Sequence, residues 1–178
     1  LIYSHGAGGL RAVASNGTEQ PITLLSSSTP AVPTSVSPTG EIVFGMGAPF
    51  RLYTLNLQSI EGQETIATEL AVALEPPGWH GSQISPDGNW IAYVSRETGD
   101  NQVYVRPFPE INGGKWQAST LPGMQPIWHP SENILFYEME NVQQYSIPYE
   151  VGGSDPDSRP SVISFGAPEP MFSRPTLR

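Results

Sequence analysis

Few stretches of this sequence carry residue types that could perform a reaction. The segment His5 to Gly9, HGAGG, has the composition of an oxyanion-stabilising loop. That chemistry also needs a nucleophile within a G-x-S-x-G motif and a distant Asp and His. No G-x-S-x-G occurs anywhere in the chain, and HGAGG equally suits a hairpin turn. We therefore predict no catalytic residue and no enzymatic activity.

Metal and cofactor sites receive no better support. His5, His80 and His129 fall in three different repeats of the chain, whereas a zinc site would need them together. The acidic stretch SDPDS, Ser154 to Ser158, offers two carboxylates but lacks the glycine and the bidentate glutamate of a calcium-binding loop. The stretch NGT, Asn16 to Thr18, fits a glycosylation acceptor, and it also makes a good hairpin turn, which we favour. We predict no metal and no cofactor.

Charge and composition exclude several classes of function. The chain has 8 Lys and Arg residues against 17 Asp and Glu residues, a net charge of −9, and no basic cluster stands out. Binding to nucleic acid or to an anionic membrane surface is therefore disfavoured. No segment approaches the roughly 18 apolar residues that a membrane-spanning helix needs. The absence of cysteine excludes disulfides and thiolate metal sites.

The same composition predicts the elements that would hold any site. The 19 prolines and 18 glycines are too many for a helical protein, because proline breaks helices and both residues favour turns. With 38% hydrophobic residues the chain can still form a core. Many short strands are expected.

A repeated unit organises these strands. Three segments share one layout, a short strand, a turn with proline and a second apolar strand: PTSVSPTGEIVFGM from Pro33, GSQISPDGNWIAYVS from Gly81 and QPIWHPSENILFYEM from Gln125. Ser37, Ser85 and His129 occupy the same place in the three segments. A period of roughly 40 to 50 residues with four short strands is typical of a β-propeller blade.

The turn residues fit a hairpin. Pro86 sets the backbone angle of the first corner, Asp87 can bond nearby backbone, and Gly88 takes the left-handed conformation that closes the turn. In the last copy of the turn, HPSEN, we expect Glu132 or Asn133 to replace the glycine, and asparagine tolerates that conformation better.

Equivalent positions in the repeats predict the core. We expect Val36, Ile84 and Trp128 to pack between blades. Four aromatic residues should lie in the second strands, partly buried: Tyr3, Phe44, Tyr93 and Phe136. The third strands are predicted near residues 10–15, 51–57, 102–108 and 142–148, and the outer strands near residues 20–25, 64–70, 115–120 and 168–172. Residues 64–74 could instead form a short helix.

The predicted fold is all-β, a β-propeller arc of about four four-stranded antiparallel blades within a larger propeller of about six to eight blades. The blades cover residues 1–32 in part, 33–78, 79–122 and 123–178 of a single propeller fragment, residues 1–178. The opening LIYSHG matches the second strand of the repeat without its first, so we expect the sequence to begin inside a longer protein. An open arc would leave its end faces bare for more chain, or a partner, to cover.

At these residues the chain resembles a known family. The segments SPDGNWIAYVSRETGDNQVYVRPFPEINGGKWQAST, QPIWHPSENILFY and FGAPEPMF are similar to the TolB-type, WD-repeat-like propellers of bacteria, and especially to the propeller half of bacterial Ser/Thr kinases. The resemblance covers about Pro33 to Phe172. Its markers, such as Ser85 to Gly88 and Tyr104 to Pro109, are residues of the fold, so it predicts architecture and hardly any activity. It implies an extracytoplasmic, periplasmic module that binds other proteins.

Loops at one mouth of the propeller supply a candidate binding surface. We predict a partner-binding rim of these residues: Phe50, Trp79, His80, Met124 and Gln125. Alternatively, Trp79 and Met124 fill gaps between blades. The predicted function is a non-catalytic protein interaction or scaffold module, such as an accessory subunit of a larger membrane-associated complex in the cell envelope. The alternative is the regulatory or sensor propeller of a kinase or serine peptidase whose catalytic domain lies outside this chain.

Overall fold

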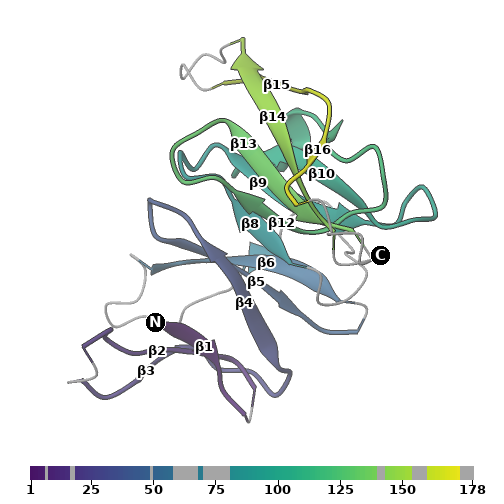
Figure 1. Cartoon of the computed structure of the whole chain (residues 1–178). Helices are drawn as coiled ribbons and strands as arrows, with labels where there is room; N and C mark the ends of the chain where they lie inside the picture. The colour runs from purple at the N-terminus through teal and green to yellow at the C-terminus, as the bar shows by residue number, and fades with distance from the viewer. Residues whose placement is uncertain are drawn as a thin grey trace. The chain divides into compact units, whose positions relative to one another are not determined.

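The computed structural model describes residues 1–6, 8–16, 19–48, 50–57, 68–69, 81–139, 143–153 and 160–172. Their regular structure consists of short antiparallel strands and a 3₁₀ turn at Ile111–Gly113, which confirms the all-β prediction. The chain divides into two compact units, residues 1–79 and 80–178, each with two sheets (Figure 1). In the described part of the chain, no helix is long and apolar enough to cross a bilayer.

The first unit contains a three-stranded and a four-stranded sheet. The first sheet has the order β1 (Ile2–Ser4), β2 (Leu10–Ala12), β3 (Ile22–Leu25). The second sheet has the order β4 (Ala31–Val36), β5 (Glu41–Met46), β6 (Arg51–Asn56), β7 (Thr68–Glu69). Thr68 and Glu69 thus belong to an outer strand and not to a helix, and the rest of residues 64–74 lies outside the described residues.

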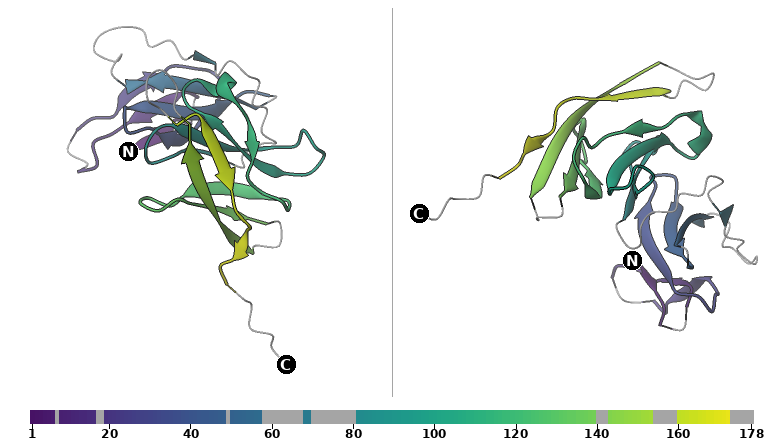
Figure 2. Two further views of the ribbon diagram at one scale, coloured as in Figure 1. Left: turned by 90° about the horizontal axis from the view of Figure 1, so that it is seen from above. Right: turned by 90° about the vertical axis from the view of Figure 1, so that its right-hand side faces the viewer.

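The second unit contains the other two sheets. The third sheet consists of β8 (Ser82–Ile84), β9 (Trp90–Ser95), β10 (Gln102–Pro107) and β11 (Trp116–Gln117). The fourth sheet consists of β12 (Met124–Trp128), β13 (Ile134–Glu138), β14 (Gln144–Gly152), β15 (Val162–Phe165) and β16 (Glu169–Pro170). The nine-residue strand β14 continues past β13 and pairs with β16 along its first part and with β15 along its last part (Figure 2).

The predicted repeat of the turn is confirmed by its hydrogen bonds. The N–H groups of Ser37, Ser85 and His129 donate to the carbonyls of Glu41, Trp90 and Ile134, over 2.7, 2.9 and 2.9 Å. In the first two repeats the side-chain oxygen at this position also accepts a hydrogen bond from a backbone N–H at the start of the second strand. Ser37 Oγ accepts from the Glu41 N–H at 2.9 Å, and Ser85 Oγ accepts from the Trp90 N–H at 3.0 Å. One residue in each repeat therefore fixes where the second strand begins.

The last turn closes in a different way from the one expected. Gly40 and Gly88 have φ of 86° and 77°, as a left-handed corner requires, but neither Glu132 nor Asn133 has a positive φ. The His129 side chain compensates, because its Nδ1 accepts the N–H groups of Ser131 at 3.3 Å and Glu132 at 2.9 Å. The expectation that Glu132 or Asn133 replaces the glycine was wrong, since the imidazole holds the turn without a left-handed residue.

Cross-strand pairs of rings repeat on one face of three sheets. The pairs join the second and third strands at ring-centroid distances of 5.6, 6.1 and 5.7 Å: Phe44 with Tyr53, Tyr93 with Tyr104, and Tyr137 with Tyr145. Phe44, Tyr93 and Phe136 lie in second strands, as expected, and Tyr3 lies in β1, which matches that strand. Phe44 and Tyr93 are fully buried, however, and not partly buried as expected. The register nevertheless makes Tyr137, and not Phe136, the residue equivalent to Phe44 and Tyr93, so Phe136 points to the opposite face.

Each unit has a core formed between its two sheets. In the first unit Leu10 and Leu24 cluster with Ile42 and Phe44, all at most 2% exposed. In the second unit the core joins residues of the third sheet to residues of the fourth: Trp90, Ala92, Val103 and Val105 with Trp128, Leu135, Tyr137 and Ile147. The burial of these apolar side chains on both sheets is the main contribution to the stability of each pair of sheets.

Trp128 also joins the third and fourth sheets by hydrogen bonds. Its backbone N–H donates to Gln83 Oε1 at 2.6 Å, and its indole N–H donates to the Gln83 carbonyl at 2.9 Å. Trp128 and Ile84 are 4% and 5% exposed, as predicted, but Val36 is 47% exposed, so its expected packing was wrong. Val36 holds in the second sheet the position that Trp128 holds in the fourth. The first sheet starts at β1, which matches the second strand of the other sheets. Among the described residues, the first sheet therefore has no strand equivalent to β8, whose Gln83 contacts Trp128.

We predict that Ser85→Ala lowers the free energy of unfolding by about 1–2 kcal/mol, because a buried N–H loses its acceptor. Chemical denaturation followed by circular dichroism measures the change. At the equivalent position, His129→Ala should be destabilising and His129→Ser should retain more stability, since serine is the residue of the other two turns. Unchanged stability of Ser85→Ala and His129→Ala would contradict a role for the side-chain acceptor.

Candidate functional site

The fourth sheet has one face buried against the third sheet and one face that is partly open. Because side chains alternate along a strand, Leu135 and Tyr137 point to the third sheet, while Phe136 and Glu138 point away. We call the open side the outer face of the fourth sheet, formed by Gln125, Ile127, Phe136, Glu138, Gln144 and Met171. Ile127 is 52% exposed and Met171 is 39% exposed, which is high for large apolar side chains.

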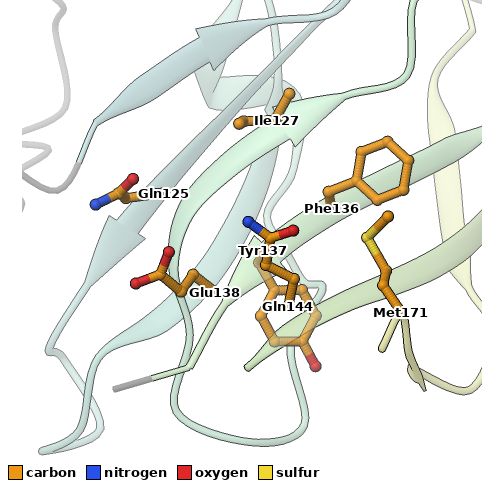
Figure 3. Close-up of a pocket in the computed structure, with 7 residues that line it drawn as sticks. All are labelled: Gln125, Ile127, Phe136, Tyr137, Glu138, Gln144 and Met171. Atoms are coloured by element: carbon orange, nitrogen blue, oxygen red, sulfur yellow. The ribbon is translucent and has the colours of Figure 1, made fainter. Parts of the chain in front are cut away.

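These six residues line a shallow pocket of about 140 Å³, together with part of Tyr137 (Figure 3). Figure 3 shows Phe136 and Met171 next to each other at one end, with Gln125 and Glu138 at the other end. The pocket thus has an apolar end and a polar end. Such a surface can receive an apolar side chain of a partner while its amides and carboxylate bond to polar groups beside it.

The end of the described chain holds Met171 in place. β16 pairs with β14, and the Met171 N–H then donates to the Gln144 carbonyl at 2.9 Å. The Gln143 amide donates to the Phe172 carbonyl, also at 2.9 Å. Met171 and Phe172, the latter 65% exposed, are therefore fixed beside the sheet although little covers them.

Glu138 supplies the charge of the pocket. Its carboxylate forms no ion pair and no hydrogen bond with any residue that the structure describes, and the amide side chains of Gln125 and Gln144 line the pocket with it. A partner that offers a cation or several N–H donors would fit this end of the pocket.

Gln125 has an unusual backbone. Its φ of 49° is left-handed, and among the described residues it is the only one besides glycine with a positive φ. It lies in a β-bulge, because the pairing of β12 with β13 shifts between Met124 and Ile127. Bulges re-aim side chains, and a left-handed residue of this kind costs about 1–2 kcal/mol. The bulge therefore places Gln125 at the pocket despite this cost.

Tyr137 forms the inner wall of the pocket and is only 1% exposed. Its hydroxyl has no hydrogen-bond partner in the described part of the protein. Burial raises the pKa of Tyr137, and its neighbour Tyr145 raises it further. The equivalent Tyr93 differs, because its hydroxyl accepts from Arg106 Nε at 3.0 Å.

The structure brings together only part of the predicted rim. Met124 and Gln125 lie next to each other at the bulge of the fourth sheet, and Gln125 lines the pocket. Phe50 belongs to the first unit and packs on the second sheet, since a Cβ added at Gly45 would lie 1.8 Å from its Cζ. Trp79 and His80 lie outside the described residues, so the rim as a whole remains a prediction.

The other predicted motifs form no further site in the described residues. The described residues of HGAGG, which are residues 5, 6, 8 and 9, lie between β1 and β2, and the Gly8 N–H donates to the His5 carbonyl at 2.7 Å. Within the described ranges no three acidic or histidine side chains lie close enough to hold a metal ion. The stretch SDPDS and residues 17 and 18 of NGT fall outside those ranges.

Most of the pocket was not predicted from the sequence. Gln125 was predicted as a rim residue, but Ile127, Phe136, Glu138 and Gln144 were not. Alternation could have indicated Ile127, because it precedes Trp128 in its strand and must face away from that residue, which was predicted to be buried. Phe136 is the cross-strand partner of Ile127 and shares its face, but it was predicted to be partly buried.

Comparison with known proteins identifies the fold. A solved structure described as TolB from Agrobacterium tumefaciens superposes with a TM-score of 0.62 at 17% identity, over 92% of this chain and 56% of that one. TolB from Acinetobacter baumannii gives a TM-score of 0.62 at 16% identity, over 77% of this chain and 34% of that one. No protein-family model and no curated protein matches. The sheets are therefore blades of a TolB-like β-propeller, and the chain spans about half, or a third, of these solved chains.

We predict that Gln125→Gly raises the free energy of unfolding by about 0.5–1 kcal/mol, because glycine adopts a left-handed φ without strain. Denaturant titration measures the change. Gln144→Gly, in the regular strand β14, is the matched control and should lower stability. A loss of stability in both variants would show that the bulge is not strained.

We also predict that Tyr137→Phe unfolds no more easily than the wild type, because its hydroxyl makes no hydrogen bond with the described residues. Tyr93→Phe is the matched change at the equivalent position and should cost about 1 kcal/mol, since it removes the bond to Arg106. Thermal unfolding of the two variants compares them directly, and equal losses would mean that Tyr137 has a partner.

Proposed function

We propose that the protein is a non-catalytic, protein-binding module that uses the outer face of the fourth sheet. The observation that carries the proposal is the exposure of Ile127 and Met171 around a pocket that also holds an unpaired glutamate within the described residues. Monomeric proteins rarely leave large apolar side chains together in solvent unless the surface binds something. Apolar anchors beside polar groups are the usual composition of a protein interface.

The finer proposal is an accessory subunit of a larger assembly in the cell envelope, outside the cytoplasm. The likeness of the fold to TolB supports this location. The same proposal includes the predicted rim, Phe50, Trp79, His80, Met124 and Gln125, because Gln125 lines the pocket and Met124 precedes it in β12. The partner would then contact both the mouth of the propeller and the outer face of the fourth sheet.

Capture from a bacterial envelope extract tests the proposal. The immobilised chain should retain a partner, identified by mass spectrometry, and Ile127→Asp should weaken its binding at least about tenfold, because burying a new carboxylate against an apolar partner is costly. Titration with the purified partner measures the affinity.

Val162→Asp is the matched control. Val162 lies in β15 of the same sheet and is 49% exposed, close to the 52% of Ile127, but it does not line the pocket. It should bind the partner like the wild type. Equal binding by both variants, or equal loss, would remove the outer face from the proposed function.

A further inference from the structure

We infer that Asn112 is a site of spontaneous deamidation to isoaspartate, in the loop that joins β10 to β11. Asn112 is exposed and belongs to the 3₁₀ turn Ile111–Gly113. Deamidation begins when the backbone nitrogen of the next residue reaches the side-chain carbonyl carbon of asparagine. Glycine hinders this approach least, because it has no side chain, and Gly113 is the next residue. Neither residue lines the pocket of the fourth sheet, so the modification is independent of the proposed function.

The side chain of Asn112 is able to turn back toward Gly113. It forms no hydrogen bond with any residue that the structure describes. Asn133 is likewise exposed, but it precedes Ile134, whose β-branched side chain hinders the approach to the backbone nitrogen. Asn112 therefore combines an accessible amide with an unhindered nitrogen.

Hydrogen bonds restrain two further asparagines. The Asn89 amide group donates to Asp87 Oδ2 at 2.9 Å, and Asn89 precedes the bulky Trp90. Asn101 is only 3% exposed, and its Oδ1 accepts a hydrogen bond from Arg96 Nε at 2.8 Å. Neither side chain can turn onto its own backbone without losing its partner, so we expect both to keep their amides.

The turn that contains Asn112 is a weak one. It has three residues, and Glu110, which precedes it, forms no side-chain capping bond. The Gly113 N–H donates to the Glu110 carbonyl at 3.1 Å, and this bond must break before the nitrogen can attack. A single turn at the surface opens at a small fraction of the free energy of global unfolding. The folded protein can therefore reach the reactive geometry.

The residues on both sides of the reactive pair are held in place. Ile111 is 3% exposed, and its carbonyl accepts a hydrogen bond from Arg106 Nη1 at 2.8 Å. On the other side Gly114 lies against the Trp116 ring, which a Cβ added at Gly114 would overlap. Opening of the turn is thus confined to the reactive pair itself.

Packing also requires a small residue after Asn112. A Cβ added at Gly113 would lie 3.2 Å from Pro107 Cγ, which is closer than ordinary van der Waals contact. The loop therefore has little room for the larger residues that would slow the attack. The fold places the fastest partner for asparagine at this exposed position.

The reaction consumes only water. The Gly113 nitrogen bonds to the side-chain carbonyl carbon of Asn112, and the side-chain amide nitrogen leaves as ammonia with the proton of the attacking N–H. One water molecule then opens the cyclic imide, and the product is aspartate or, more often, isoaspartate. The net change replaces the amide by a carboxylate.

Isoaspartate would change this loop in two ways. It adds a methylene group to the backbone, and it adds a negative charge close to the exposed Glu110. Lys115, two residues after Gly113, pairs with Glu97 and lies 5.0 Å from the centre of the Tyr104 ring. A lengthened backbone would displace Lys115 from both partners. We therefore expect conversion to loosen the attachment of the loop to β10.

Peptide mapping of the folded protein tests the inference. The native chain is kept at neutral pH for several weeks and digested, and mass spectrometry measures the conversion of amide to acid in each peptide. Asn112 should convert at least about tenfold faster than Asn133, the matched exposed asparagine of the same molecule, because Ile134 hinders the attack there. Fragmentation of the peptide backbone distinguishes isoaspartate from aspartate. It also separates Asn112 from Asn16, which precedes a glycine as well.

Two variants complete the test. Asn112→Gln should keep its amide, because glutamine must form a larger ring. Asn112→Asp carries the new charge without the added methylene group. The converted fraction, isolated by ion exchange, should unfold at a lower denaturant concentration than the unconverted protein and than Asn112→Asp.

Equal rates at Asn112 and Asn133 would overturn the site, and so would conversion of Asn112 that occurs only in denaturant, because the turn would then protect it. A converted fraction that unfolds like the unconverted protein would overturn the loosening of the loop.

Discussion

A sheet with two apolar faces needs a neighbour on each side, and this requirement shapes the whole protein. Strand β9 is buried along almost its entire length, so residues on both of its faces are removed from water. The strands of the fourth sheet alternate instead, with Leu135 and Tyr137 buried and Phe136 and Glu138 partly open. What a sheet of this fold can bind is therefore decided by which of its faces another sheet already occupies.

The turn after the first strand decides which residues reach each face. A single side-chain acceptor, a serine twice and a histidine once, closes the turn and sets the register of the following strand. A shift of one residue would exchange the buried and the open sets of side chains. The packing of Trp128 on Gln83 and the composition of the pocket both depend on that register.

The repeat was predictable from sequence, and the details that failed have physical causes. The proline-containing turn indicated the strand order and the equivalence of Ser37, Ser85 and His129, because such turns have strict chemistry. Phe136 was assigned by its ring alone, whereas counting from the turn selects Tyr137. The exposure of Val36 depends on whether a strand of the neighbouring sheet covers it, which the residues around Val36 do not specify. The outer face of the fourth sheet was not predicted for the same reason, since the residues of a strand do not show whether another sheet covers its second face. The strained Gln125 follows from a bulge, which no residue pattern announced.

The positions of the tryptophans have a consequence for spectroscopy. Of the four in the chain, Trp90, Trp116 and Trp128 lie in the second unit, in or against the core between the third and fourth sheets. The Trp128 indole is 4% exposed and hydrogen-bonded to Gln83 of the neighbouring sheet. Separation of these two sheets would expose the indole to solvent and break its hydrogen bond, so the fluorescence of these three tryptophans reports the interface between the third and fourth sheets. The described residues of the first unit include no tryptophan, so a probe of its sheets would use their tyrosines or an added label.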